Sequence, residues 1–168
     1  SGYPGKIYDN LSLSEVLKKE KITPDFDYQS SQKAVIDFIH TKIGDQDFYF
    51  LSNQKATPVE IEAIFRQTEK IPEIWLTKDG NIYPQKIYST TKGHNMMPLH
   101  FAPNESKFVV FTPGEAEHVA AVEKDGKRIF PFTGISYQMP IFSSQKDFIC
   151  SSIGEYNITW SNGKLEKF

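Results

Sequence analysis

Hydrophobic and polar residues alternate along most of the chain. The clearest case is residues 59–66, where Val59, Ile61, Ala63 and Phe65 are separated by single, mostly polar residues. A repeat of two places successive side chains on opposite faces of a β-strand. Comparable runs predict further strands at residues 34–43, 47–52, 73–76, 82–88, 97–101, 106–112, 118–123, 128–130, 156–160 and 164–168.

The turns between these runs favour antiparallel pairing. Residues 78–81 contain Asp-Gly, and residues 161–163 contain Asn-Gly between two alternating runs. Such dipeptides are the strongest short-range signal for a β-hairpin. Strands that follow one another closely, without intervening helices, are typical of a sandwich. We therefore expect an all-β protein in which residues 31–168 form an antiparallel β-sandwich, immunoglobulin-like or jelly-roll-like.

The N-terminal part has a helical pattern instead. Ser12 and Glu15 have the spacing of a capping box, in which each side chain bonds a free backbone amide at the start of a helix. Apolar residues then recur at helical spacing, and Pro24 ends the helix by about Ile22. So short a helix has too little apolar surface to stand alone. We expect residues 1–30 to be a helical flap that docks on the sandwich or on another part of a larger protein.

Composition and charge exclude several classes of function. The formal net charge is −2, so no broad positive surface is available for nucleic acid. No apolar run approaches the roughly 20 residues of a membrane-spanning helix. The single cysteine, Cys150, excludes an internal disulfide, and its apolar neighbours predict that it is a buried small hydrophobe.

The titratable residues suggest no reactive site. Glu60 and Glu62 share one face of a predicted strand, as a glycosidase pair would, but their apolar neighbours claim the core face, so we expect both in solvent. The pair His40 and Asp47 is interpreted as a hydrogen-bonded clasp. The histidines follow no metal-binding pattern, so we predict no metal, no cofactor and no catalytic residue. We likewise expect no pocket in which titratable side chains with displaced pKa values converge.

The aromatic residues offer one opening for binding. Trp75, Tyr83 and Tyr88 are candidates for carbohydrate contact, since the C–H faces of sugar rings pack well on flat aromatic rings. Trp75 stands opposite in phase to Ile74, which predicts that it points out of the core. The alternative is that all three aromatic residues fill the sandwich.

Several segments resemble, in the same order, parts of the large bacterial glycoside hydrolases of the α-L-rhamnosidase type, glycoside hydrolase family 106. The resemblance is strongest over residues 36–54, with its His, Gly-Asp-x-Asp and Tyr-Phe pattern; Thr41 stands where the family has Arg. It continues through Pro-Glu-Ile-Trp at residues 72–75, residues 106–111 and the hairpin at residues 154–164.

The resemblance implies a part of a larger enzyme. In the family, the catalytic acid and base lie on a preceding barrel, so no catalytic residue carries over. What it implies is a non-catalytic accessory domain, partnered by neighbouring domains of the same polypeptide and possessing a preceding-domain tail in residues 1–30. The parent enzyme would act on plant or microbial glycans and be periplasmic or secreted. A carbohydrate-binding module that uses exposed aromatics, a protein-interaction domain and a small self-contained hydrolase stay open as alternatives.

Overall fold

The computed structural model describes residues 5–91, 93–131, 141–144, 148–150 and 152–168. Within these ranges strands account for nearly all regular structure, and the one helix is α1 (Leu13–Lys19). The predicted all-β class is therefore confirmed. No helix in the described ranges has both the length and the apolar character needed to cross a membrane.

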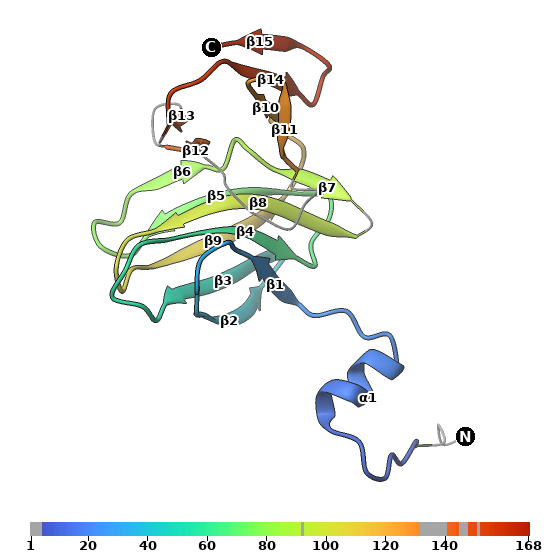
Figure 1. The fold of residues 1–168 in the computed structure, drawn as a ribbon. Coiled ribbons are helices and arrows are strands. Elements are labelled where there is room, and N and C mark those ends of the chain that lie inside the picture. Colours follow the sequence, from blue (N-terminus) through green and yellow to red (C-terminus); the bar gives the residue numbers. More distant parts are fainter. Residues whose placement is uncertain (1–4, 92, 132–140, 145–147, 151) are drawn as a thin grey trace.

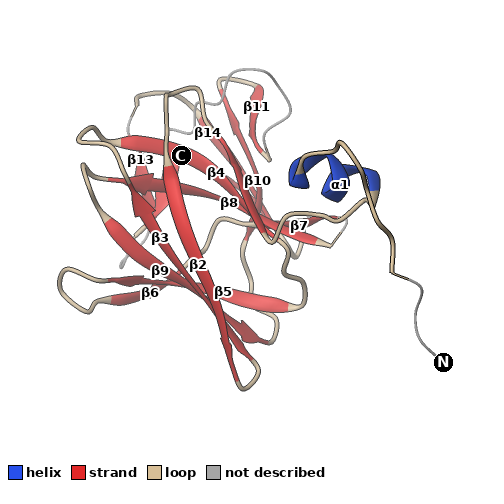
Figure 2. Ribbon diagram, turned by 90° about the horizontal axis from the view of Figure 1, so that it is seen from below, coloured by secondary structure: helices blue, strands red, loops and turns tan. Residues whose placement is uncertain are grey.

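Two antiparallel sheets face each other and form the predicted sandwich (Figures 1 and 2). The first has the strand order β1 (Phe26–Gln29), β4 (Val59–Phe65), β8 (His94–Phe101), β7 (Ser89–Thr91). The second has the order β2 (Ile36–Ile43), β3 (Gln46–Asn53), β9 (Ser106–Pro113), β5 (Lys70–Leu76), β6 (Ile82–Pro84). Because β1 pairs with β4, the sandwich begins upstream of residue 31.

The core between the sheets follows from the alternation in the sequence. The inward residues of β4 are all buried, and Tyr49, Val109 and Phe111 meet them from the second sheet. Phe65 lies between Tyr49 and Phe111, with ring centroids 4.9 and 5.1 Å away. Burial of such large rings is the main stabilising contribution available to the fold.

The C-terminal strands form a separate layer with its own core. One antiparallel sheet has the order β11 (Lys127–Phe130), β10 (Val119–Lys124), β14 (Tyr156–Trp160), β15 (Leu165–Lys167), and a second pairs β12 (Ile141–Ser143) with β13 (Phe148–Cys150). Val122, Phe130 and Ile158 lie in a hydrophobic cluster distinct from that of the sandwich. Figure 1 shows these strands above the sheet that contains β4 and β8.

Residues 86–88 join the two layers. After β6 the chain does not continue along the sandwich; instead, Tyr88 N–H donates to Val119 O at 3.2 Å, and Val119 N–H donates to Lys86 O at 2.7 Å. Ile87 forms a parallel bridge with Val119 and is fully buried in the C-terminal cluster. The predicted strand 82–88 therefore ends at Pro84.

The N-terminal helix lies apart from both sheets (Figures 1 and 2). The capping box of Ser12 and Glu15 is present as predicted, but the helix ends at Lys19, before Ile22. Glu20 ties the helix to the preceding chain by accepting bonds from Lys6 and from the Tyr8 hydroxyl. No helix residue is buried, so the helix itself does not pack on the sandwich, whereas β1 in the same segment pairs with β4.

Two sequence predictions about burial are wrong. Glu62 is only 1% exposed, because the C-terminal strands cover part of the outer face of its sheet: Phe142 of β12 packs there against His100, with ring centroids 5.8 Å apart. Cys150 is exposed: among the described residues β13 pairs with β12 alone, and it is Phe148 of this strand, not Cys150, that packs against the C-terminal cluster.

Candidate functional site

The candidate site lies where one sheet of the sandwich has a half-open edge. β7 pairs with β8 only as far as Met96, so residues 97–101 of β8 have β4 on one side and, among the residues that the structure describes, no strand on the other. An open edge leaves backbone carbonyls that need partners. Pro98 suits this position, because it has no N–H to leave unpaired.

Two buried side chains replace the absent strand. Gln85, immediately after β6, donates from Nε2 to Pro98 O at 3.0 Å and accepts at Oε1 from Ile87 N–H. Lys107 of β9 donates from Nζ to His100 O at 2.6 Å. Both side chains are buried, and they occupy much less room than a strand would.

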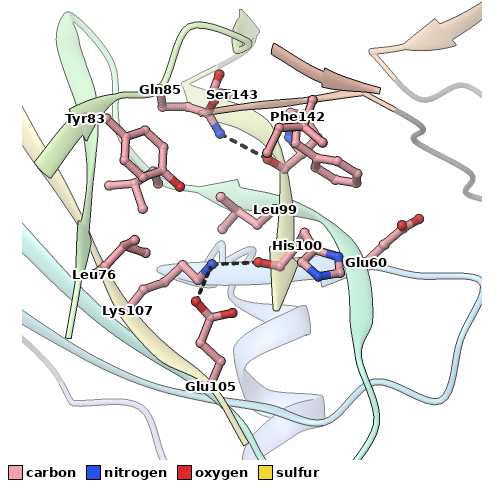
Figure 3. Close-up of a pocket in the computed structure, with 13 residues that line it drawn as sticks. Glu60, Leu76, Tyr83, Gln85, Leu99, His100, Glu105, Lys107, Phe142 and Ser143 are labelled. Atoms are coloured by element: carbon pink, nitrogen blue, oxygen red, sulfur yellow. Dashed lines mark hydrogen bonds and ion pairs between the residues drawn. The ribbon is translucent and has the colours of Figure 1, made fainter. Parts of the chain in front are cut away.

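The space left over is a cavity of about 370 Å³, which we call the edge pocket (Figure 3). Its inner wall is apolar and includes Leu76, Leu99 and Phe142. Polar side chains converge on it from four segments that are distant in sequence; they are Glu60, Tyr83, Gln85, His100, Glu105, Lys107 and Ser143. Of the predicted carbohydrate-contact residues, Tyr83 alone lines this pocket.

Burial shifts the pKa values of several of these groups. It raises the pKa of Glu60 and, together with the charge of Glu105, raises that of Tyr83 to about 12. Burial also lowers the pKa of Lys107, against the opposing influence of Glu105. The Tyr83 hydroxyl therefore keeps its proton at neutral pH and can donate a hydrogen bond. Titratable side chains thus do converge in one pocket, which was not expected, but among them the pKa of Tyr83 alone is strongly displaced.

The pocket nevertheless lacks the two free carboxylates of a glycosidase. Glu105 has one oxygen 3.2 Å from Lys107 Nζ and accepts a 2.6 Å bond from Ala102 N–H on the other. A catalytic acid or nucleophile needs an accessible oxygen. Glu60 is thus the one pocket carboxylate for which the described residues show no side-chain bond.

The other two aromatic candidates lie elsewhere. Trp75 is half-buried on the outer face of the five-stranded sheet, opposite in direction to Ile74 as its phase predicts; its Nε1 donates to Glu73. Tyr88 is buried and stacks on His118 with ring centroids 3.8 Å apart. It lines a second cavity of about 680 Å³ with His118 and Asn162.

The predicted clasp between His40 and Asp47 is present. His40 lies 2.7 Å from Asp47 through Nε2 and 2.5 Å from Asp25 through Nδ1, and its ring stacks on Tyr49. Lys70 also bonds the Asp47 carboxylate. The carboxylate oxygens are thus bound to protein groups, and the described part of the chain contains no cluster of three or more His, Cys, Asp or Glu side chains suited to a metal.

The edge pocket could not be found by motif. Its polar residues are separated by up to 83 positions, Glu60 to Ser143, and Gln85 and Lys107 belong to it only because β7 is short. A lysine in phase with the core residues Val109 and Phe111 was the one available signal, since lysine is rarely buried without a partner.

Comparison with known proteins gives one family. The model of glycoside hydrolase family 106, described as alpha-L-rhamnosidase, matches residues 3–89. A "Putative beta-glucuronidase" of Formosa agariphila is 32% identical over 112 residues, which are 66% of this chain and 10% of that protein.

A solved structure agrees with this match. The rhamnosidase of Novosphingobium sp. PP1Y has 29% sequence identity and a TM-score of 0.57; the match covers 67% of this chain and 12% of that chain. The chain thus spans about a tenth of the length of the relatives that it matches.

Proposed function

Since the chain belongs to glycoside hydrolase family 106, the alpha-L-rhamnosidases, we propose that it is a non-catalytic accessory domain of a multidomain glycosidase. Its role is to support neighbouring domains of the same polypeptide. The observation that carries the proposal is coverage: the match spans 10% and 12% of the two relatives. The engagement of Glu105 by Lys107 and Ala102 supports it, because it leaves the edge pocket without a free carboxylate pair.

The outer face of the five-stranded sheet is the surface we assign to a neighbouring domain. Five apolar side chains cross the whole sheet in register, and we call them the outer row; they are Ile39, Phe50, Phe108, Trp75 and Ile82. Ile39 is 65% exposed and Ile82 is 52% exposed, one at each edge of the sheet. An exposed apolar band that crosses a sheet is typical of an interface.

The total surface is also larger than a compact domain of this mass would expose. A compact domain of 19.2 kDa is expected to expose about 8,400 Å². This chain exposes 10,376 Å², well above that value. The N-terminal segment contributes to the excess, because Ile7 and Leu13 are 90% and 74% exposed. A standard interface covers about 800 Å² on each partner, so the excess is large enough for docking.

The remaining assignments follow from the family. We propose that residues 1–30, whose strand β1 already belongs to the sandwich, connect it to a preceding domain, that residues 31–168 form the rest of the accessory domain, and that the parent enzyme works on glycans outside the cytoplasm. The family relation also favours docking within one polypeptide over a role as an independent protein-interaction domain.

Hydrolysis tests the non-catalytic role. The 168-residue chain should not release the chromophore from an aryl α-L-rhamnoside or an aryl β-glucuronide, whereas the full-length parent should hydrolyse its own substrate. Glu60→Gln serves as the diagnostic variant. Turnover that follows the purified chain through chromatography and is lost in Glu60→Gln would overturn the proposal.

Charge placed in the outer row tests the docking surface. In the full-length parent, Ile39→Lys combined with Ile82→Lys should lower the midpoint of thermal unfolding; in the isolated chain it should have little effect, because both side chains are exposed there. Ile153→Lys is the matched control, since Ile153 is fully exposed outside the row. Equal effects of the double variant in both proteins would contradict docking at the outer row.

A further inference from the structure

We propose that the edge pocket binds a single uncharged sugar ring. This site goes beyond the support role proposed above, which stands whether or not the pocket is occupied. The inference rests on three properties of the pocket: polar groups left without protein partners, an apolar wall facing them, and a charge balance that disfavours anions.

Three polar side chains line the pocket without satisfying one another. The Tyr83 hydroxyl, the imidazole of His100 and the carboxylate of Glu60 make no side-chain hydrogen bond to any residue that the structure describes. Figure 3 shows Tyr83 across the cavity from His100, with Glu60 beyond His100, each on a different strand. Tyr83 and Glu60 are half-buried and His100 is exposed, so solvent reaches these groups, and a ligand that displaces the solvent must replace its hydrogen bonds. A ligand with several hydroxyl groups supplies donors and acceptors for all three.

The apolar wall selects among such ligands. Leu99 is 4% exposed at the base of the pocket, and Leu76 and Phe142 stand beside it. A ligand must therefore present an apolar surface and hydroxyl groups on one small body. A pyranose ring has this character, with axial C–H bonds on its faces and hydroxyl groups at its rim. A purely apolar ligand would leave Tyr83, His100 and Glu60 desolvated and unpaired.

The charges of the pocket favour a neutral ring. Lys107 supplies its one buried positive charge, and Glu105 balances it at 3.2 Å. Glu60 then adds a negative charge, and burial lowers the pKa of His100, so the imidazole is uncharged at neutral pH. An anionic sugar would bring a further negative charge into this partly buried site, which is unfavourable.

The size of the cavity limits the ligand to one ring. Ligand pockets span about 300–1,000 Å³, and 370 Å³ is close to the lower end. Gln85 and Lys107 close the inner end through their bonds to Pro98 and His100. We therefore assign the site to a terminal or branching sugar of a glycan, held by one ring, rather than to a long oligosaccharide.

The test is a titration of the ¹⁵N-labelled 168-residue chain followed by NMR. The probes are methyl β-D-glucoside, methyl α-D-mannoside and methyl α-L-rhamnoside as neutral rings, and methyl β-D-glucuronide as the anion matched to the glucoside. At least one neutral glycoside should shift the amides of Tyr83, Leu99 and His100 in fast exchange, with a Kd on the order of 1 mM. The glucuronide should bind more weakly than the glucoside by about tenfold or more.

Two variants and a control make the result specific. Tyr83→Phe removes only the hydroxyl and should weaken binding by about fivefold. Glu60→Gln removes the extra negative charge and should reduce the difference between the Kd values for the glucoside and the glucuronide. Tyr88→Phe, in the second cavity, should change neither the affinity for neutral glycosides nor the difference between glucoside and glucuronide. The NMR spectra also report whether each variant is folded.

The opposite results would overturn the proposal. Pocket amides that shift with none of the neutral glycosides would exclude the site. Shifts that are unchanged in Tyr83→Phe would place binding elsewhere. Equal binding of glucoside and glucuronide would refute selection for an uncharged ring. None of these outcomes bears on the support role, which is tested by hydrolysis and by charge in the outer row.

Discussion

At the scale of single residues, Lys107 shows most clearly what the sequence could and could not predict. The capping box of Ser12 and Glu15 and the clasp of His40 and Asp47 were both predicted, because their partners are close in sequence. The bond from Lys107 to His100 O depends on the unpaired edge of β8, which depends in turn on where β7 ends. No local sequence pattern encodes where β7 ends.

Removal of the Lys107 ammonium should be strongly destabilising. Lys107→Met leaves the His100 carbonyl without its donor and Glu105 without its ion-pair partner, so the free energy of unfolding should fall by about 3 kcal/mol. Urea unfolding followed by fluorescence measures this. Lys78→Met, at an exposed turn, should change it by less than about 0.5 kcal/mol. Similar values for the two variants would contradict the role of Lys107.

Asp47 should make the fold sensitive to acid. Burial opposes its ionisation, but the hydrogen bonds from Lys70 and His40 outweigh burial and hold the pKa of Asp47 below its usual value. A lowered pKa in the folded state contributes stability that is complete above the unfolded pKa of about 3.9 and is lost as pH falls through the folded value.

Urea unfolding between pH 7 and pH 3 tests this contribution. Asp47→Asn should be less stable at pH 7 and should lose less stability than the original chain below about pH 4. Asp45→Asn, on the exposed turn beside it, should retain the original acid profile. Parallel pH profiles for Asp47→Asn and the original chain would refute the assignment.

At the scale of elements, long alternating strands were predictable and short ones were not. β3, β4 and β9 each bury every second residue, and the repeat located all three. β1 and β7 have only 4 and 3 residues, too few for a period to be visible. Alternation also cannot say whether the second face of a sheet is covered, which is why Glu62 was placed wrongly.

The helix should be dispensable for the isolated sandwich, and β1 should not be. Deletion of residues 1–22 removes no residue that is buried in a core, so the midpoint of urea unfolding should stay the same. Deletion of residues 1–29 also removes Phe26, whose ring centroid lies 5.1 Å from that of Phe65, and should lower the midpoint clearly. An equal loss in both truncations would show that the helix packs on the sandwich after all.

At the scale of the whole molecule, the chain has two hydrophobic cores joined by residues 86–88. The sandwich cluster and the C-terminal cluster share no buried residue, and Ile87 reaches the second one through its bridge to Val119. Separate cores commonly open as separate cooperative units. The sequence predicted the longer strands of both but showed no sign of the division, because strand order across a sheet depends on contacts between distant segments.

Hydrogen exchange should resolve the two units. Ile158→Ala removes a fully buried side chain from the C-terminal cluster and should cost about 2–4 kcal/mol there. Amides of β10 and β14 should exchange faster, while those of β3 and β9 keep their protection. The control, Ile74→Ala in the sandwich cluster, should reverse the pattern. A uniform loss of protection in either variant would mean that the chain opens as one unit.

The change of partner at residues 86–88 has a consequence for how such a cavity arises. If this segment had continued alongside β8 rather than crossing to Val119, backbone hydrogen bonds between the two strands would have closed the cavity. Gln85 and Lys107 would then have had no unpaired carbonyl groups of β8 to cap. The C-terminal layer would then also have lost its attachment to the sandwich through residues 86–88. The same change in the path of the backbone thus attaches the C-terminal layer and leaves a cavity in the sandwich.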